Sequence, residues 1–280
     1  MNFRIAVLFL GMMLMSIPAY CQLVEEYNPP QANCCLAMAA RNLADQLLDW
    51  NQLGRYWKEN QELKKQSPDP NRVLFMGDSI TDFWRLDEYF PGKPYINRGI
   101  SGQTTSQMLV RMYPDVISLR PAVVVILAGI NDISQNTGPV TAEIVEQNIM
   151  AMTDLAQHHG IKVILCSILP VSDYAYLKQQ KNRAVSFSTT RDRGKSNYDI
   201  PIAMMKVTDT HPPGDILRLN AWMKDYASRV NAIYADYFSA LVDERGWLKE
   251  NCSNDGIHPN AEGYKIMAQI IESAIRKALP

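Results

Sequence analysis

The chain has 280 residues, of which 47% are hydrophobic and 20% are charged, which is enough apolar material for one large core. Its formal net charge is −1 and its isoelectric point lies near 6.4, so the chain as a whole has no electrostatic attraction to nucleic acid or to an anionic membrane. Composition therefore favours a globular protein with no nucleic-acid partner.

Residues 1–21 have the pattern of a secretory signal peptide. Arg4 precedes an apolar run from Ile5 to Met15, and small residues follow at the spacing of a cleavage site. The run is short for a membrane span, although an uncleaved anchor remains an alternative. Cys21 suggests lipidation as another alternative, but Tyr20 stands where lipid-attachment sequences usually carry a small residue. We expect a secreted or periplasmic protein with no stable membrane association after cleavage.

Residues 22–70 are predicted to form an N-terminal extension with a helix. Asn28 to Pro30 disfavours helix at the start of this extension. Apolar residues then recur at three- and four-residue spacing from Leu36 to Leu48, and the spacing continues to Trp57. Ser67 to Pro70 breaks the helix. A helix packed against the following domain fits this pattern better than a separate module.

Short apolar runs alternate with helical patterns from residue 71 to residue 280. A helical pattern occupies Thr141 to His158, and another runs from Met267 to Ala274 with Asn260 as its expected N-cap. The expected strands are Val73 to Met76, Tyr95 to Asn97, Val123 to Leu127, Lys162 to Cys166 and Ala232 to Tyr237. Such alternation predicts an α/β protein with a mostly five-stranded parallel sheet between two helical layers.

Residues 171–213 depart from this alternation. The stretch is mostly polar and mixes lysines and arginines with aromatic residues. Loops of this length in a compact domain are usually functional or disordered. We interpret the stretch as an insertion near the carboxyl edge of the sheet. It is either a lid or substrate-binding element whose positive charge suits an anionic substrate, or a solvated loop.

Two motifs at opposite ends of this domain predict a serine nucleophile and its base. Residues 77–81 read Gly-Asp-Ser-Ile-Thr after the first strand, and residues 255–259 read Asp-Gly-Ile-His-Pro before the last helix. A serine hydroxyl needs an imidazole to take its proton and a third group to hold that imidazole. Ser79, His258 and Asp255 have those chemistries. The alternatives are a helix-capping serine and a surface-loop histidine.

Two further segments supply candidate hydrogen-bond donors for an oxyanion. Residues 97–104 read Asn-Arg-Gly-Ile-Ser-Gly-Gln-Thr after the second strand, and residues 129–132 read Gly-Ile-Asn-Asp after the third. Gly102 has no side chain to crowd a substrate, and the Asn131 amide donates a hydrogen bond without carrying a charge. Their alternative interpretation is ordinary turn structure.

These four segments, in this chain order, resemble the SGNH, or GDSL, hydrolase family over roughly Arg72 to Pro280. The resemblance implies a flavodoxin-like three-layer α/β/α sandwich. It also implies ester hydrolysis through an acyl-enzyme, without a cofactor.

The resemblance also assigns roles to five residues. It makes Ser79 the nucleophile, His258 the general base and Asp255 the partner that orients the base. The Ser79 N–H, the Gly102 N–H and the Asn131 side-chain amide become the oxyanion hole.

Four cysteines remain after Cys21. A disulfide from Cys34 or Cys35 is possible in an oxidising compartment, whereas Cys166 ends an apolar run and is expected to be a buried thiol. Metal binding is not predicted, because the adjacent histidines at 158 and 159 lack the flanking ligands of a zinc site.

The motifs leave the substrate open among small-molecule, glycan and lipid esters, and they do not address the oligomeric state. We favour short acyl groups, especially acetyl groups on sugars, because no long continuous apolar lid is visible. A lysophospholipase or lipase is the alternative with the same chemistry, and a non-catalytic envelope binding protein is the alternative of another class. Since the base must be neutral, activity is predicted to rise with pH through roughly 6 to 7.5.

Overall fold

The computed structural model describes residues 47–189 and 206–279. The predicted signal peptide, residues 22–46 and the cysteines at 34 and 35 lie outside the described residues. Five parallel strands form one sheet in the order β2-β1-β3-β4-β5. The strands are β1 Val73–Gly77, β2 Tyr95–Gly99, β3 Val123–Leu127, β4 Lys162–Cys166 and β5 Ile233–Ala235.

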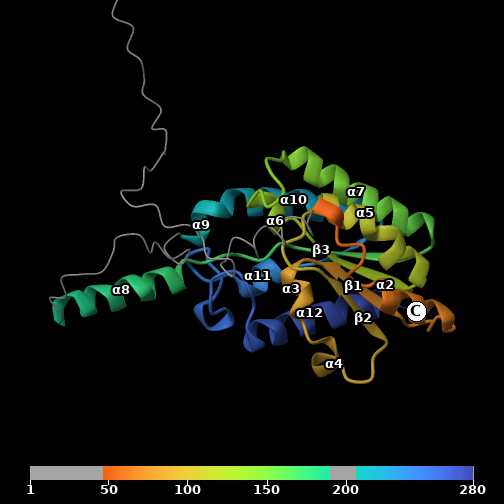
Figure 1. Ribbon diagram of the computed structural model, residues 1–280, viewed down its shortest axis with the longest axis horizontal. Coiled ribbons are helices and arrows are strands. Elements are labelled where there is room, and N and C mark those ends of the chain that lie inside the picture. The colour runs from red at the N-terminus through yellow and green to blue at the C-terminus, as the bar shows by residue number, and fades with distance from the viewer. Residues whose placement is uncertain (1–46, 190–205, 280) are drawn as a thin grey trace, which may run out of the picture. The chain divides into compact units, whose positions relative to one another are not determined.

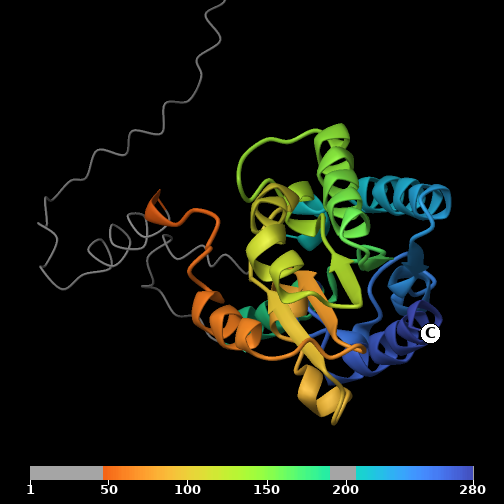
Figure 2. The same cartoon turned by 90° about the vertical axis from the view of Figure 1, so that its right-hand side faces the viewer.

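Helices cover both faces of this sheet (Figures 1 and 2). One face packs against α5, α7 and α10, and the other packs against α3, α4, α11 and α12. The helices are α2 Trp57–Lys65, α3 Ser79–Asp82, α4 Leu86–Tyr89, α5 Thr105–Asp115, α6 Ile130–Ile133, α7 Ala142–His158, α8 Tyr174–Thr189, α9 Val207–Thr210, α10 Pro213–Arg229, α11 Tyr237–Leu241 and α12 Ala261–Ala278. This is the predicted α/β/α sandwich.

The two cores explain why the strands are apolar throughout. Along β1, Leu74 and Met76 point into the core under α5 and α7, whereas Val73 and Phe75 point into the core under α12. Side chains alternate between the two faces of a strand, so a strand covered on both faces has no polar side. The five expected strands are therefore confirmed, with ends that shift by at most two residues.

Two predicted helices are also confirmed, together with the predicted cap at Asn260. Thr141 caps α7 through a side-chain hydrogen bond from the Ile144 N–H. Asn260 caps α12 and accepts hydrogen bonds from the N–H groups of Glu262 and Gly263. Both caps satisfy amides that the first turn of a helix leaves free.

The sequence predicts that the helical pattern before residue 48 continues to Trp57. Among the residues that the structure describes, this prediction is wrong. Residues 49–56 form turns, and α2 begins only at Trp57. The Asp49 carboxylate accepts hydrogen bonds from the N–H groups of Leu53 and Gly54 at 2.8 and 2.9 Å. A side chain that satisfies these amides competes with the helical hydrogen bonds, which periodicity alone does not reveal.

The 171–213 stretch is not one long loop in its described part. Tyr174–Thr189 forms α8, and Val207–Thr210 forms α9. The first turn of α8 is held by a hydrogen bond from the Tyr174 hydroxyl to Asp243. A lid or substrate-binding role for this stretch stays a prediction, as do the domain boundaries.

Cys166 and Cys252 are buried, and neither forms a disulfide with another described residue. Cys166 is 0% exposed, so the prediction of a buried thiol at this position is confirmed. Burial raises the pKa of this thiol to about 12. Within residues 47–189 and 206–279, no helix combines the length and apolar character needed to cross a membrane.

Candidate active site

Ser79 is the first residue of the short helix α3, in the turn that follows strand β1. All five residues of β1 are buried, and the strand brings the chain to the carboxyl edge of the sheet. Asp78 caps α3, because its Oδ1 accepts a hydrogen bond from the Ile80 N–H at 3.0 Å. Ser79 is 8% exposed, so its hydroxyl sits on a well-packed turn.

The structure brings Ser79, His258 and Asp255 into one hydrogen-bonded chain. Ser79 Oγ lies 2.9 Å from His258 Nε2, although 179 residues separate the two in sequence. His258 Nδ1 lies 2.7 Å from Asp255 Oδ2. A proton on Nδ1 that is donated to the carboxylate leaves Nε2 free to accept the serine proton.

Hydrogen bonds determine the charges of this pair. Burial opposes ionisation of Asp255, but hydrogen bonds from the His258 ring and from the N–H groups of Ile257 and His258 outweigh it and hold the Asp255 pKa below its ordinary value. The hydrogen bond to Asp255 raises the pKa of His258, and burial only partly opposes it. The carboxylate therefore stays charged, and the imidazole is more basic than a free one.

Gly256 allows the turn that joins these two residues. Its φ of +91° lies in the left-handed region, and a Cβ there would come within 2.1 Å of the Ser172 carbonyl oxygen. The Ser172 N–H in turn donates to the Gly256 carbonyl at 2.9 Å. Only glycine both adopts this φ without strain and avoids a clash with Ser172. The turn can therefore pack tightly against the chain that follows β4.

The loops after β2 and β3 flank the Ser79 turn, because β1 lies between those strands. Gly102 follows β2 and has a φ of +79°. Asn131 lies in the first turn of α6, and its Nδ2 donates to the Gln103 carbonyl at 3.0 Å. Asn136 Nδ2 lies 3.2 Å from the Gly102 carbonyl oxygen and 2.9 Å from Asn131 Oδ1. The structure thus joins Gly102 and Asn131 in one hydrogen-bonded unit.

Several polar groups near the site were not predicted from the sequence. Asp78 is completely buried, and its Oδ2 has no hydrogen-bond partner among the described residues. Burial raises the pKa of Asp78 to about 7. Asp132 is also buried, and it accepts hydrogen bonds from the N–H and the hydroxyl of Thr105. Both aspartates stand inside motifs that the sequence identifies, but their burial cannot be read from the motifs.

A second histidine comes from the end of the 171–213 stretch. His211 follows α9 and is 7% exposed, with Nδ1 2.9 Å from Thr210 Oγ1. Burial lowers its pKa, and charge on His258 acts in the same direction. Thr208 anchors α9 through two hydrogen bonds to Asp173, which follows Ser172 in the chain. The described ends of the stretch therefore lie close to the Asp255–His258 turn.

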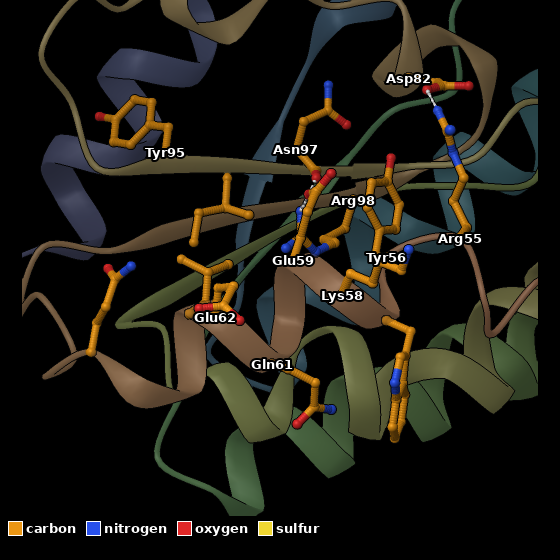
Figure 3. Close-up of a pocket in the computed structure, with 14 residues that line it drawn as sticks. Arg55, Tyr56, Lys58, Glu59, Gln61, Glu62, Asp82, Tyr95, Asn97 and Arg98 are labelled. Atoms are coloured by element: carbon orange, nitrogen blue, oxygen red, sulfur yellow. Dashed lines mark hydrogen bonds and ion pairs between the residues drawn. The ribbon is translucent and has the colours of Figure 1, made fainter.

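A groove of about 1010 Å³ lies between α2 and β2 (Figure 3). Its lining includes Asp82 but not Ser79. The Asp82 carboxylate accepts hydrogen bonds from the N–H and the hydroxyl of Ser101, and it also pairs with Arg55 at 3.4 Å. The groove therefore borders the Gly102 loop from outside the site. No group of three or more His, Cys, Asp or Glu suited to a metal occurs among the residues that the structure describes.

Solved structures share this architecture. A candidate acylhydrolase from Bacteroides fragilis is 36% identical, with a TM-score of 0.68, over 83% of this chain and 99% of that one. A GDSL-like lipase from Bacteroides thetaiotaomicron is 35% identical, with a TM-score of 0.66, over 82% and 99%. An acetyl xylan esterase from Geobacillus stearothermophilus shares the fold at 19% identity and a TM-score of 0.53, over 74% and 95%.

A curated relative matches a shorter part of this chain. The uncharacterized lipoprotein YqeF of Bacillus subtilis is 30% identical over 79 residues, which are 27% of this chain and 32% of that protein. The chain thus spans about a third of that relative's length. A family model, by contrast, covers residues 75–266, from β1 into α12. The chain belongs to the GDSL-like lipase/acylhydrolase family and is a hydrolase of ester bonds.

Proposed function

We propose that the protein is a serine esterase that cleaves short-chain carboxylic esters through an acyl-enzyme on Ser79. The supporting observation is the unbroken hydrogen-bonded chain from Ser79 Oγ through His258 to the Asp255 carboxylate. An isolated serine is a weak nucleophile, and this arrangement supplies both the base and the group that orients it.

In the first step, His258 Nε2 takes the Ser79 proton while Oγ forms a bond to the ester carbonyl carbon. The carbonyl oxygen becomes an oxyanion, and the imidazole becomes an imidazolium facing the Asp255 carboxylate. The imidazolium then gives its proton to the alcohol oxygen as the carbon–oxygen ester bond breaks. An acyl group remains on Ser79.

The oxyanion needs preorganised donors at the carboxyl edge of the sheet. The Ser79 N–H, the Gly102 N–H and the Asn131 side-chain amide are our candidates. Asn131 Nδ2 donates one of its two hydrogens to the Gln103 carbonyl. Its second hydrogen is left for the oxyanion. Each such donor typically contributes about 10²–10³ in rate.

Water completes the cycle by the same proton route. His258 takes a proton from water, the hydroxide adds to the acyl carbon, and the Ser79 oxygen leaves with the proton. The products are an acid and a regenerated serine. The chemistry uses no cofactor.

Part of the rim of the site is polar and favours a polar alcohol group. Ser101, Asn136 and Thr137 lie exposed on the two loops that flank the Ser79 turn. Such side chains suit the hydroxyls of a sugar better than a long aliphatic chain. An acetyl ester on a carbohydrate is therefore our preferred substrate, and a lysophospholipase or lipase substrate is the alternative.

Hydrolysis of p-nitrophenyl acetate, butyrate and octanoate tests this function. We expect the highest kcat/KM on acetate and a loss of at least about 10³-fold in Ser79→Ala. Ser118→Ala is the matched control, because Ser118 is a half-buried serine whose hydroxyl donates to the Tyr113 carbonyl. Equal residual rates in wild type and Ser79→Ala would favour a non-catalytic binding protein, and a maximum on octanoate would favour the lipase alternative.

We also propose that residues 1–21 direct export. The apolar run in this segment supports export, as does the partial likeness to a lipoprotein. The N-terminal sequence of the protein purified from its native host tests the proposal. A start at residue 22 is expected, and an intact Met1 would contradict it.

A further inference from the structure

Arg111 binds the carboxyl ends of two strands at once. The residue lies in α5, and its side chain is completely buried. Its guanidinium donates to the carbonyl of Gly77 at 2.9 Å and to the carbonyl of Arg98 at 2.7 Å. Gly77 leads into the Ser79 turn, and Arg98 leads into the loop that carries Gly102. One rigid, planar group thus holds the two loops in a fixed relation.

Gln103 connects this arginine to the oxyanion loop. It is 1% exposed and follows Gly102 directly. Its Oε1 accepts a hydrogen bond from Arg111 Nε at 2.5 Å, and its Nε2 donates to the Asn51 carbonyl at 3.0 Å. Its own carbonyl accepts the hydrogen bond from the Asn131 amide. Both loop-borne candidate donors are therefore connected to one residue: Gly102 precedes Gln103 in the chain, and Asn131 donates to the main-chain carbonyl of Gln103.

The segment ahead of the first strand completes the network. Asn60 of α2 is 1% exposed, donates to the Asp115 carboxylate at 2.6 Å and accepts two hydrogen bonds from Arg98. Asp115 in turn lies 3.2 Å from Arg111. Figure 3 shows Arg98 next to the Tyr56 ring, whose centroid is 4.5 Å from the guanidinium carbon. The Tyr56 hydroxyl donates to the carbonyl of Gly99, at the end of β2.

We propose that Gln103 and Arg111 are positioning residues for the oxyanion hole, and that Asn51 to Asn60 anchors them. The inference rests on the proposed function. It adds that a segment outside the four motifs maintains the geometry of the donors. Displacement of a donor by about 1 Å is enough to lose much of its contribution to the rate. Since these residues touch neither Ser79 nor His258 in the described contacts, the base and its titration should be unaffected.

Gln103→Met tests the proposal, because methionine keeps the length of the side chain and loses both hydrogen bonds. We expect kcat on p-nitrophenyl acetate to fall about 10–100-fold, with KM within about 2-fold and an unchanged pH midpoint of kcat/KM. The matched control is Gln157→Met. Gln157 likewise donates to a backbone carbonyl, that of Val230 at 2.7 Å, but at the end of α7. Its kcat should stay within about 2-fold of wild type.

A folded Gln103→Met enzyme with wild-type kcat would overturn the proposal, as would a parallel loss of kcat in Gln157→Met. If Gln103→Met does not fold, Gln103→Glu tests the proposal in its place. Glutamate can still accept the hydrogen bond from Arg111, but it cannot donate to the Asn51 carbonyl. A lower kcat at unchanged KM supports the proposal, and wild-type kcat overturns it. Failure of the proposed function is a separate result, since wild type would then lack Ser79-dependent activity altogether.

Discussion

At the scale of single residues, two carboxylates near Ser79 lie in opposite environments. Asp255 is held charged by hydrogen bonds from its own turn and from His258. Asp78 is buried beside Ser79, one of its oxygens has no hydrogen-bond partner in the part of the chain that the structure describes, and burial raises its pKa to about 7. One aspartate thus favours the protonated imidazole that forms during the reaction, and the other carries a proton through much of the acidic range.

The pH dependence of kcat/KM should follow His258. The base must be neutral, and its pKa is raised by Asp255, so kcat/KM should increase with pH with a midpoint above about 6.5. In Asp255→Asn the midpoint should shift to lower pH and kcat should fall at least about 10²-fold. Steady-state kinetics between pH 5 and about 9 measure both effects. An unchanged midpoint in Asp255→Asn would contradict the assigned pair.

Asp78 should make stability depend on pH. Its folded pKa of about 7 lies above the ordinary value of 3.8, so the folded state binds this proton more tightly than the unfolded state. The contribution is fully present below pH 3.8 and is lost as pH rises through about 7.

Urea unfolding of wild type and Asp78→Asn at several pH values isolates this contribution. We compare the unfolding free energy of the variant minus that of wild type. This difference should increase by up to about 4 kcal/mol between pH 4 and pH 8, because only wild type loses the contribution of Asp78. A pH-independent difference would show that Asp78 ionises normally.

At the scale of elements, short turns at the carboxyl edge of the sheet place the reactive groups. The Asp255–His258 turn is fixed by α12, which Asn260 caps, and by the backbone contact between Gly256 and Ser172. A substitution in this turn should therefore affect the reaction as well as stability.

Gly256→Ala should lower kcat/KM at least about 10-fold and destabilise the fold by about 1–3 kcal/mol, because a Cβ meets the Ser172 carbonyl in a strained backbone. Gly160→Ala is the matched control. Gly160 also has a positive φ, of +73°, but no atom of the described residues lies within 4 Å of its added Cβ. It should lose stability and keep kcat/KM. Thermal unfolding followed by circular dichroism measures the stability of both variants, and ester kinetics measure their kcat/KM. Equal kcat/KM in the two would contradict a role of this turn in placing His258.

The elements also show what can be predicted from sequence. The strands are predictable because burial on both faces requires continuous apolar runs. The turn at Asp49 is not, because a side chain that satisfies the amides of Leu53 and Gly54 interrupts an otherwise helical spacing. Local patterns reveal elements, whereas local competition for hydrogen bonds decides where they end.

At the scale of the whole molecule, strand order assembles the site. β1 lies between β2 and β3, so the Ser79 turn lies between the Gly102 loop and the Asn131 turn. The four motifs can be found in the sequence because each lies in a short segment next to a strand or a helix. Gln103 and Arg111 could not be assigned in this way, since their partners at Gly77 and Asn51 become neighbours only in the folded chain.

The central claim is that Ser79 carries the acyl group. Titration with a fluorophosphonate, followed by peptide mass spectrometry, tests this claim most directly, with residual esterase activity measured on the same samples. We predict a single adduct on Ser79 and a loss of activity in proportion to its modification. Full activity with Ser79 completely modified, or loss of activity through an adduct on another residue, would contradict the account.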